Sequence, residues 1–408
     1  MFKSTAIATA VVLSCTGGMA SAAEIPIYDN DFDKHFKAAK PGDVFKIYPG
    51  LYKLNKTAHL EASGTKDNPI IIRPADESGK VIIEASTKVA FSITGAYWTV
   101  EGMNVYGACS NHGRCEHVIH ISGNADKTVI RNNTFVDFNS AIKGNGRIIN
   151  GRQFFPDHVL IENNRIYNNT PRNTSAPVTP VDVVGGRYWT VRGNFIADFA
   201  KAKGNKVSYA AFLKGNSDNG LFERNLVICE WRHTGGTRVG LSLGGGGTSN
   251  PDYCQGRSCK IEHYKGTIRS NVIMNCPKDV GIYLNYAANT NITNNTILNT
   301  TGVDVRFNGS FATMANNVIE GRILARDDGR FREINNLVEK NLRSLFPNLS
   351  QYDLTPSNPQ ELGKAAFGFE GVDYCTGKEQ EDWKGAMVPP AQCKISDQLA
   401  DIEADSGQ

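Results

Sequence analysis

The sequence has little net charge and no long hydrophobic run at its start. Its 408 residues include 44 Lys and Arg against 41 Asp and Glu, for a formal charge of +3. That balance does not by itself argue for a nucleic-acid partner, although clustered cations would suit an anionic glycan. The apolar run Ala6–Leu13 is too short to span a bilayer.

Two familiar site motifs are also missing. The cysteines show no CxxC pair or His spacing of the kind that binds zinc. Gly244–Gly247 is a run of four glycines, but no Lys-Ser/Thr pair and no predicted helix follow it, so it is not a phosphate loop. We interpret it as a tight turn that lets a glycan approach the backbone closely.

Residues 1–22 have the form of a secretory leader, with Lys3, the apolar run and a small-residue cleavage site at Met19–Ala22. The alternatives are an uncleaved anchor and a lipoprotein attached at Cys15. We expect a mature chain that begins near Ala23 or Glu24, carries a charge of about +2 and is secreted or periplasmic.

Cleavage leaves eight cysteines, an even number that favours disulfides in an exported chain, with zinc as the rival interpretation. Two pairs are close in sequence and would staple loops, and a third pair remains for the C-terminal tail. The fourth pair, Cys229 and Cys276, has matching offsets in neighbouring repeats, where rungs about 4.8 Å apart would allow a bridge. The predicted pairs are Cys109–Cys115, Cys254–Cys259, Cys375–Cys393 and Cys229–Cys276.

A short β-rich unit with an Asn corner repeats along the chain. Residues 279–300 contain apolar strands at Gly281–Leu284, Asn291–Thr293 and Thr296–Leu298, separated by turns. The corner Asn recurs at spacings of 31, 30, 31, 46, 24, 22 and 19 residues, at Asn133, Asn164, Asn194, Asn225, Asn271, Asn295, Asn317 and Asn336. A repeat near the low twenties is typical of a parallel β-helix with a ladder of stacked amides, and the alternative is an all-β sandwich rich in Asn.

The predicted fold class is therefore all-β, a single-stranded right-handed parallel β-helix. An N-terminal cap over residues 23–60 contains an amphipathic helix that buries Phe32, Phe36 and Ala39. The β-helix follows over 61–341, then a C-terminal segment over 342–395 that packs on it, and an acidic tail over 396–408 that we expect to be disordered. The long repeats carry extra loops, and loops on a rigid scaffold are common binding sites.

The opening of the chain resembles one enzyme family. AAKPGDVFKIYPGLYKL at 38–54 and SGTKDNPIIIRPADESGKVII at 63–83 are similar to the N-terminal signature of the chondroitinase B/alginate lyase family of β-helical polysaccharide lyases. The resemblance implies binding of a uronate-containing polysaccharide and its cleavage by β-elimination.

Counting back from the corner Asn residues aligns one strand across several rungs. Alternation then places a row of polar side chains on one outer face. The row consists of Asp182, Lys214, Arg238, Tyr283, Asp304 and Arg306, to which we add Asn285 as a substrate-binding candidate. A solvated sheet face is the ordinary alternative for any single member.

The row suits β-elimination, which needs a base, an acid and a neutralised carboxylate. We predict Lys214 as the base, with a pKa lowered by the cationic neighbours Lys206, Arg232 and Arg238. Arginine would bind the carboxylate in a bidentate manner, and Tyr283 would pass a proton. Asp182, Asp304 and Arg306 complete the predicted substrate-binding set with Lys206, Arg232 and Asn285.

The segment from Lys214 to Arg232-His233-Thr234 also resembles the family's lysine followed by Arg-His-Gly, which makes His233 a further catalytic candidate. The acidic calcium cluster expected just before that lysine is absent. Either Lys206 replaces the metal or the chemistry differs. Calcium stays open as a cofactor, with scattered Asp182, Asp218 and Asp304 as its only acidic candidates.

The leading hypothesis is an exported lyase that acts as a monomer on an acidic polysaccharide, without a nucleic-acid or membrane partner. A glycoside hydrolase using Asp182 and Asp304 is the first alternative. A uronate epimerase shares the first proton abstraction, and a non-catalytic glycan-binding β-helix would need a row of aromatic side chains. The four tryptophans, Trp98, Trp189, Trp231 and Trp383, do not fall in one row.

Overall fold

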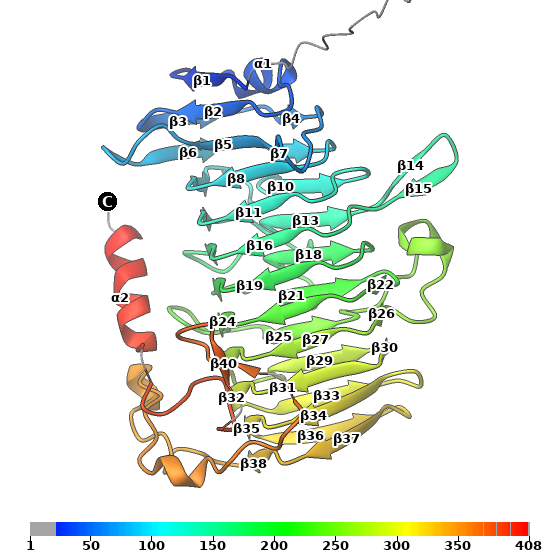
Figure 1. Ribbon diagram of the computed structural model, residues 1–408, viewed down its shortest axis with the longest axis vertical. Coiled ribbons are helices and arrows are strands. Elements are labelled where there is room, and N and C mark those ends of the chain that lie inside the picture. Colours follow the sequence, from blue (N-terminus) through cyan, green and yellow to red (C-terminus); the bar gives the residue numbers. More distant parts are fainter. Residues whose placement is uncertain (1–21, 370, 381, 392, 407–408) are drawn as a thin grey trace, which may run out of the picture.

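The chain folds as a right-handed parallel β-helix, an elongated stack of rungs in which each rung adds one strand to each of three sheets (Figure 1). The computed structural model describes residues 22–369, 371–380, 382–391 and 393–406. Apart from Ala22, the predicted leader lies outside the described residues. Within the described part of the chain, no helix is long and apolar enough to cross a bilayer.

The three long sheets, named A, B and C here, are parallel throughout. Sheet A contains β1 (Glu24–Ile27), β2 (Val44–Ile47), β5 (Ile70–Pro74), β8 (Trp98–Glu101), β11 (Val129–Arg131), β16 (Leu160–Glu162), β19 (Thr190–Arg192), β23 (Leu221–Glu223), β27 (Thr267–Arg269), β31 (Thr290–Thr293), β34 (Phe311–Ala315) and β37 (Arg330–Ile334). Sheet B contains β3 (Gly50–Leu54), β6 (Val81–Ala85), β9 (Asn104–Gly107), β12 (Thr134–Val136), β17 (Arg165–Tyr167), β20 (Phe195–Ala197), β24 (Leu226–Ile228), β28 (Val272–Cys276), β32 (Thr296–Thr300), β35 (Val318–Glu320) and β38 (Leu337–Glu339). Sheet C contains β4 (Ala58–Leu60), β7 (Val89–Ile93), β10 (His117–Ser122), β13 (Ile142–Asn145), β18 (Val181–Val184), β21 (Val207–Lys214), β25 (Thr237–Leu243), β29 (Ile282–Asn285), β33 (Gly302–Arg306) and β36 (Arg322–Arg326).

The unit predicted over 279–300 is one full rung. Its three strands are β29 in sheet C, β31 in sheet A and β32 in sheet B. The remaining short elements are β14 (Arg147–Ile149), β15 (Arg152–Phe154), β22 (Ser217–Asp218), β26 (His263–Tyr264), β30 (Ala287–Ala288), β39 (Gly371–Val372), β40 (Glu379–Gln380), η1 (His112–Arg114), η2 (Pro251–Tyr253), η3 (Gln255–Arg257), η4 (Leu349–Gln351) and η5 (Pro359–Glu361).

The predicted ladder of corner Asn side chains runs along the junction of sheets A and B. Each buried Asn donates its Nδ2 to the Oδ1 of the next, at 2.9 Å from Asn133 to Asn164 and 2.9 Å from Asn225 to Asn271. The residue before the ladder Asn turns the corner in the left-handed conformation, as Asn132 does at φ 56° and Asn294 at φ 54°. Asn tolerates that conformation better than most residues, which explains the repeated Asn-Asn pair.

A short helix closes the N-terminal end of the stack, as predicted. Helix α1 (Phe32–Lys37) buries Phe32 and Phe36 completely. The Phe36 ring meets those of Phe45 and Trp98 at centroid distances of 5.0 and 6.2 Å. Strand β1 adds one further rung before the helix, which the sequence did not indicate.

The C-terminal segment folds back over the outer face of sheet B, where it buries apolar side chains such as Phe346 and Leu362. The sequence suggested a disordered tail from residue 396, which is wrong for most of that stretch. Helix α2 (Ile395–Ser406) lies beside the stack (Figure 1). It is ordered because Ile395, Leu399 and Ile402 share one helical face and are buried.

All four predicted cysteine pairs are disulfides. Cys229–Cys276 joins neighbouring rungs with a Cα–Cα distance of 5.0 Å. The other three bridges are Cys109–Cys115, Cys254–Cys259 and Cys375–Cys393. The β14–β15 hairpin and the stapled loop around η2 and η3 project from the same edge of the stack (Figure 1), and the Gln153 amide bonds the Cys254 carbonyl at 3.0 Å.

Candidate active site

A groove of about 490 Å³ lies on the outer face of sheet C, over strands β13, β18 and β21. Its walls are loops that extend the long rungs, including the loop of the 46-residue repeat. The groove is lined by Lys143, Pro177, Val178, Thr179, Asp182, Val184, Lys201, Asn205, Val207, Tyr209, Phe212, Lys214, Gly246, Gly247, Thr248, Ser249, Asn250 and Tyr253. The predicted base, Lys214, is therefore inside a walled site rather than on an open sheet face.

Lys214 is the last residue of β21 and is partly buried. Its Nζ donates a hydrogen bond to the Gly247 carbonyl at 2.7 Å and lies 5.0 Å from the centre of the Phe212 ring. Burial lowers the pKa of Lys214 below its ordinary value, Asp182 and Glu262 oppose the shift, and Lys143 adds to it. The cause differs from the predicted one, because Lys206, Arg232 and Arg238 do not contribute. The Lys206 side chain is exposed near the start of β21.

The glycine run packs directly on Lys214. A Cβ at Gly245 would lie 3.0 Å from the Phe212 ring and 3.4 Å from Lys214 Cδ, and the φ of Gly245 is +49°. A side chain there would displace the loop, which explains the need for glycine. Asn285 fixes the loop by donating its Nδ2 to the Gly245 carbonyl at 2.7 Å. Asn285, predicted to bind substrate, is thus buried under the loop.

Glu262, which the sequence did not single out, anchors both sides of this contact. Its carboxylate accepts hydrogen bonds from Gly215 N at 2.7 Å and from the Thr248 hydroxyl at 2.9 Å, and also from Thr248 N. Gly215 follows Lys214, and Thr248 follows the carbonyl that Lys214 binds. The buried carboxylate therefore holds the loop and the lysine in register.

Asp182 and Lys143 form an ion pair on the groove floor. They are direct partners in the β13–β18 ladder, and Lys143 Nζ lies 2.7 Å from Asp182 Oδ1. Asp182 points outward as predicted and aligns with Phe212 on β21. Lys143 was missed, although its ammonium is a cation close to Lys214.

Tyr209 and Tyr253 place phenols in the groove, whereas the predicted Tyr283 does not line it. Tyr209 lines the groove, and its hydroxyl lies 3.9 Å from the position of a Cβ at Gly246. The Tyr283 ring lies 6.5 Å from the Tyr209 ring and does not reach the lining. Burial raises the pKa of Tyr209 above its ordinary value, and the neighbouring Tyr283 raises it further.

Asp304 and Arg306 lie on the same sheet but outside the groove. Both are on β33, three strands beyond β21. The Asp304 carboxylate accepts from Arg326 at 2.6 Å, and Arg306 pairs with Asp327. Their charges are already matched within the protein.

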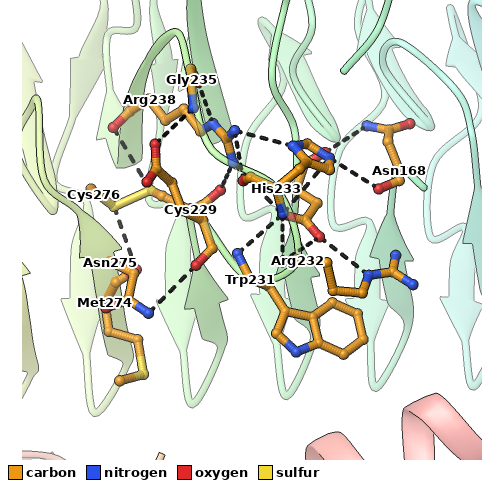
Figure 2. Close-up of polar contacts among 12 residues, drawn as sticks. Asn168, Cys229, Trp231, Arg232, His233, Gly235, Arg238, Met274, Asn275 and Cys276 are labelled. Atoms are coloured by element: carbon orange, nitrogen blue, oxygen red, sulfur yellow. Dashed lines mark hydrogen bonds and ion pairs between the residues drawn. A yellow bond between two sulfur atoms is a disulfide. The ribbon is translucent and has the colours of Figure 1, made fainter. Parts of the chain in front are cut away.

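The predicted outward position of Arg238 is wrong. Its guanidinium is buried and bonds the carbonyls of Cys229, His233 and Gly235, the last at 2.9 Å. Figure 2 shows these groups gathered at a corner of the rung, beside the Cys229–Cys276 bridge. Arg238 pairs with the buried Ser208 in the ladder between β21 and β25. The inward and outward alternation of β21 switches further along the strand, so counting back from the corner Asn assigns Arg238 to the wrong side.

His233 and Arg232 belong to the same corner, which forms around the buried carboxylate of Asp198. That carboxylate accepts from the backbone N–H of Trp231 and Arg232 at 3.0 Å each, and Arg232 Nε lies 3.3 Å away. His233 Nε2 bonds the Asn168 carbonyl at 3.3 Å (Figure 2). None of Arg232, His233 and Arg238 lines the groove.

The acidic residues do not fit a calcium site. Calcium takes six to eight oxygen ligands, whereas each candidate carboxylate is held by a cation. Asp182 lies 2.7 Å from Lys143, Asp218 lies 3.0 Å from Arg187, and Asp304 lies 2.6 Å from Arg326. Within the described ranges, no group of three or more His, Cys, Asp or Glu side chains could hold a metal ion.

Comparison with known proteins agrees with the resemblance seen in the sequence. The family model described as chondroitinase B matches residues 28–207. No curated protein sequence matches the chain. The expected resemblance to the chondroitinase B/alginate lyase family is confirmed over these residues.

Solved structures share the fold at low sequence identity. Pectate lyase Pel9A is similar with a TM-score of 0.53 and 14% identity, over 91% of each chain. XylC, solved in complex with xylose, is similar with a TM-score of 0.52 and 12% identity, over 72% of this chain and 66% of that one.

Proposed function

We propose that the protein is an exported lyase that cleaves a uronate-containing polysaccharide by β-elimination in the sheet C groove. The observation that carries this proposal is Lys214, a lysine at the groove floor whose pKa is lowered by burial. A lysine in that state holds a larger fraction of free amine near neutral pH, as a general base requires. The four disulfides support an oxidising, extracytoplasmic location.

Three groove residues have roles in this reaction. The Lys214 amine takes the C5 proton of the uronate, and the C–H electron pair forms the C4–C5 double bond as the C4–O bond breaks. The Tyr209 hydroxyl gives a proton to the departing oxygen. Solvent then takes the extra proton from Lys214 and returns a proton to Tyr209. The Lys143 ammonium offers its charge to the carboxylate on which negative charge develops.

A glycoside hydrolase is less well supported by the acidic residues that the sequence put forward. Asp182 and Asp304 lie on β18 and β33, four strands apart in sheet C. At about 4.8 Å per strand this is about 19 Å. Paired carboxylates of glycosidases are about 5 to 9.5 Å apart.

The test is turnover by Lys214→Ala on a panel of alginate, pectate, glycosaminoglycans and bacterial exopolysaccharides, followed by ultraviolet absorbance of the unsaturated product. Loss of a general base lowers kcat by about 10²- to 10⁴-fold. Lys203→Ala, at an exposed lysine outside the groove, is the matched control and should behave as wild type. Normal turnover by a folded Lys214→Ala variant would overturn the assignment. A changed C5 configuration without absorbance would indicate an epimerase.

A further inference from the structure

Lys201 is a third lysine of the groove, besides Lys143 and Lys214, and lies outside the elimination machinery. It lies between β20 and β21, its residue is 7% exposed, and it contributes to the groove lining. The backbone around it is fixed to the preceding rung, because Arg172 N donates to Ala200 O at 2.8 Å and Ala202 N donates to Arg172 O at 3.0 Å. The backbone position of Lys201 is therefore set by the rung, and its side chain contributes to the groove lining.

The Lys201 ammonium has no anionic partner within the described residues. Lys214 also lacks an ion pair, but its Nζ donates a hydrogen bond to the Gly247 carbonyl at 2.7 Å. Lys143 has Asp182 at 2.7 Å, and the buried Arg172 has Asp137 at 3.6 Å. Burial alone lowers the pKa of Lys201, without any contribution from a carboxylate. A buried ammonium without a counter-charge is costly. An anion supplied from outside would offset that cost.

We propose that Lys201 is an anion-binding subsite for an acidic group on a sugar unit other than the one that is cleaved. This inference rests on the proposed function and adds a second recognition point to it. Lys201 precedes β21, whereas Lys214 ends it, and eight residues at about 3.3 Å per residue separate the ends of that strand by about 23 Å. Lys201 therefore lies away from Lys214 and from the sugar on which Lys214 acts. The Asn205 side chain lines the same end of the groove.

The consequence is a requirement for acidic groups at two positions along the glycan. The anion bound by Lys201 is a carboxylate or a sulfate, since both accept hydrogen bonds from an ammonium. A polymer with a single acidic group would fill the Lys214 end alone. It should show a higher KM with little change in kcat, because remote binding energy is lost while the reacting groups stay in place.

The test is Lys201→Met, which keeps the length and apolar stem of the side chain but removes the charge. The expected result is a KM about tenfold higher for the acidic polymer, the typical effect of one charge-assisted hydrogen bond, and a kcat within about twofold of wild type. Lys201→Arg should restore most of the affinity. Lys203→Met, at the exposed lysine two residues away, is the control and should leave KM unchanged. An unchanged KM for Lys201→Met would overturn the proposal.

Two further arms separate the possible outcomes. Desulfated chondroitin, which keeps its uronate, identifies the bound group, because the Lys201→Met penalty in KM disappears on it if Lys201 binds a sulfate and persists if Lys201 binds a carboxylate. Affinity electrophoresis in gels containing pectate or chondroitin sulfate tests binding without turnover. If wild type cleaves no acidic glycan, the lyase assignment fails. Stronger retardation of wild type than of Lys201→Met would still support the subsite, and equal retardation would overturn it.

Discussion

The Lys143 ammonium lies 2.7 Å from the Asp182 carboxylate, and the two residues are direct neighbours in the ladder of sheet C. Both groups influence Lys214 on the next strand, since Asp182 raises its pKa and Lys143 lowers it. Burial is the main cause of the lowered pKa of Lys214, and the two members of the ion pair adjust it in opposite directions.

Removing the charge of Asp182 and removing the charge of Lys143 should shift the pH dependence of kcat in opposite directions. Asp182→Asn removes a charge that raises the pKa of Lys214, so activity should rise at lower pH than in wild type. Lys143→Met removes a charge that lowers this pKa, so the rise should move to higher pH. The measurement is kcat against pH for both variants on one acidic polymer. Shifts in the same direction would contradict the proposed coupling.

Glu262 should control the order of the glycine loop. In Glu262→Gln, one carboxylate oxygen becomes an NH₂ donor, which then faces the backbone N–H of either Gly215 or Thr248, because these two bond different oxygens. We expect faster hydrogen exchange over residues 244–250 and a lower kcat, because the loop no longer positions Lys214. Glu230→Gln, near the Asp198 corner and outside the groove, is the comparison variant. If hydrogen exchange in the glycine loop of Glu262→Gln is as slow as in wild type, the loop does not depend on the carboxylate for its order.

The sequence was sufficient for the fold because its signals are periodic. The spacing of Asn133 and its successors specified the rungs, and the offsets of Cys229 and Cys276 specified their register. The same alignment correctly placed Lys214 and Asp182 on the outside of sheet C. Each of these predictions uses the strict alternation and stacking of parallel strands.

The rest of the site escaped this reasoning where periodicity is broken. Ala210 and Ala211 are both buried, so alternation switches within β21, and Tyr209 and Phe212 both face outward. Lys143 lies 21 residues before its corner Asn, whereas Asp182 lies 12 before its own, because the β14–β15 hairpin is inserted in between. Lys201 is in a loop, where no period applies.

The middle of the Asn ladder should be more sensitive to substitution than its end. Asn225 Nδ2 donates to Val191 O at 2.8 Å and to Asn271 Oδ1 at 2.9 Å, and Asn225 Oδ1 accepts from Asn194. Asn225→Ala leaves several buried groups unpaired, at about 1 to 3 kcal/mol each. Asn336→Ala, at the partly exposed end of the ladder, should cost about 1 kcal/mol. Urea unfolding measures both, and equal losses would contradict a buried ladder.

His263 should make stability dependent on pH. It is fully buried, its Nε2 accepts from Gly220 N at 3.2 Å, and its Nδ1 therefore donates to the Ser217 hydroxyl at 2.7 Å. Burial lowers the pKa of His263 from 6.5 to about 3. The unfolded chain binds this proton first, so the stabilisation is complete above pH 6.5 and is lost as the pH falls toward 3.

The expected loss is at most about 5 kcal/mol, from 1.36 kcal/mol per pKa unit. Urea unfolding at several pH values between 7.5 and 4 measures it. His263→Gln, which has a donor and an acceptor but does not titrate, should show a shallower decline over the same range. Equal slopes for the two proteins would mean that other groups cause the acid sensitivity.

The Cys229–Cys276 bridge should contribute more stability than the Cys109–Cys115 bridge. The first closes a sequence separation of 47 residues and the second a separation of 6. The loss of loop-closure entropy in the unfolded chain corresponds to about 4 kcal/mol for the long loop and about 2 kcal/mol for the short one. Replacing each pair by two alanines and measuring urea unfolding tests this order. A larger loss from the short-loop variant would show that local native contacts, rather than chain entropy, determine what each bridge contributes.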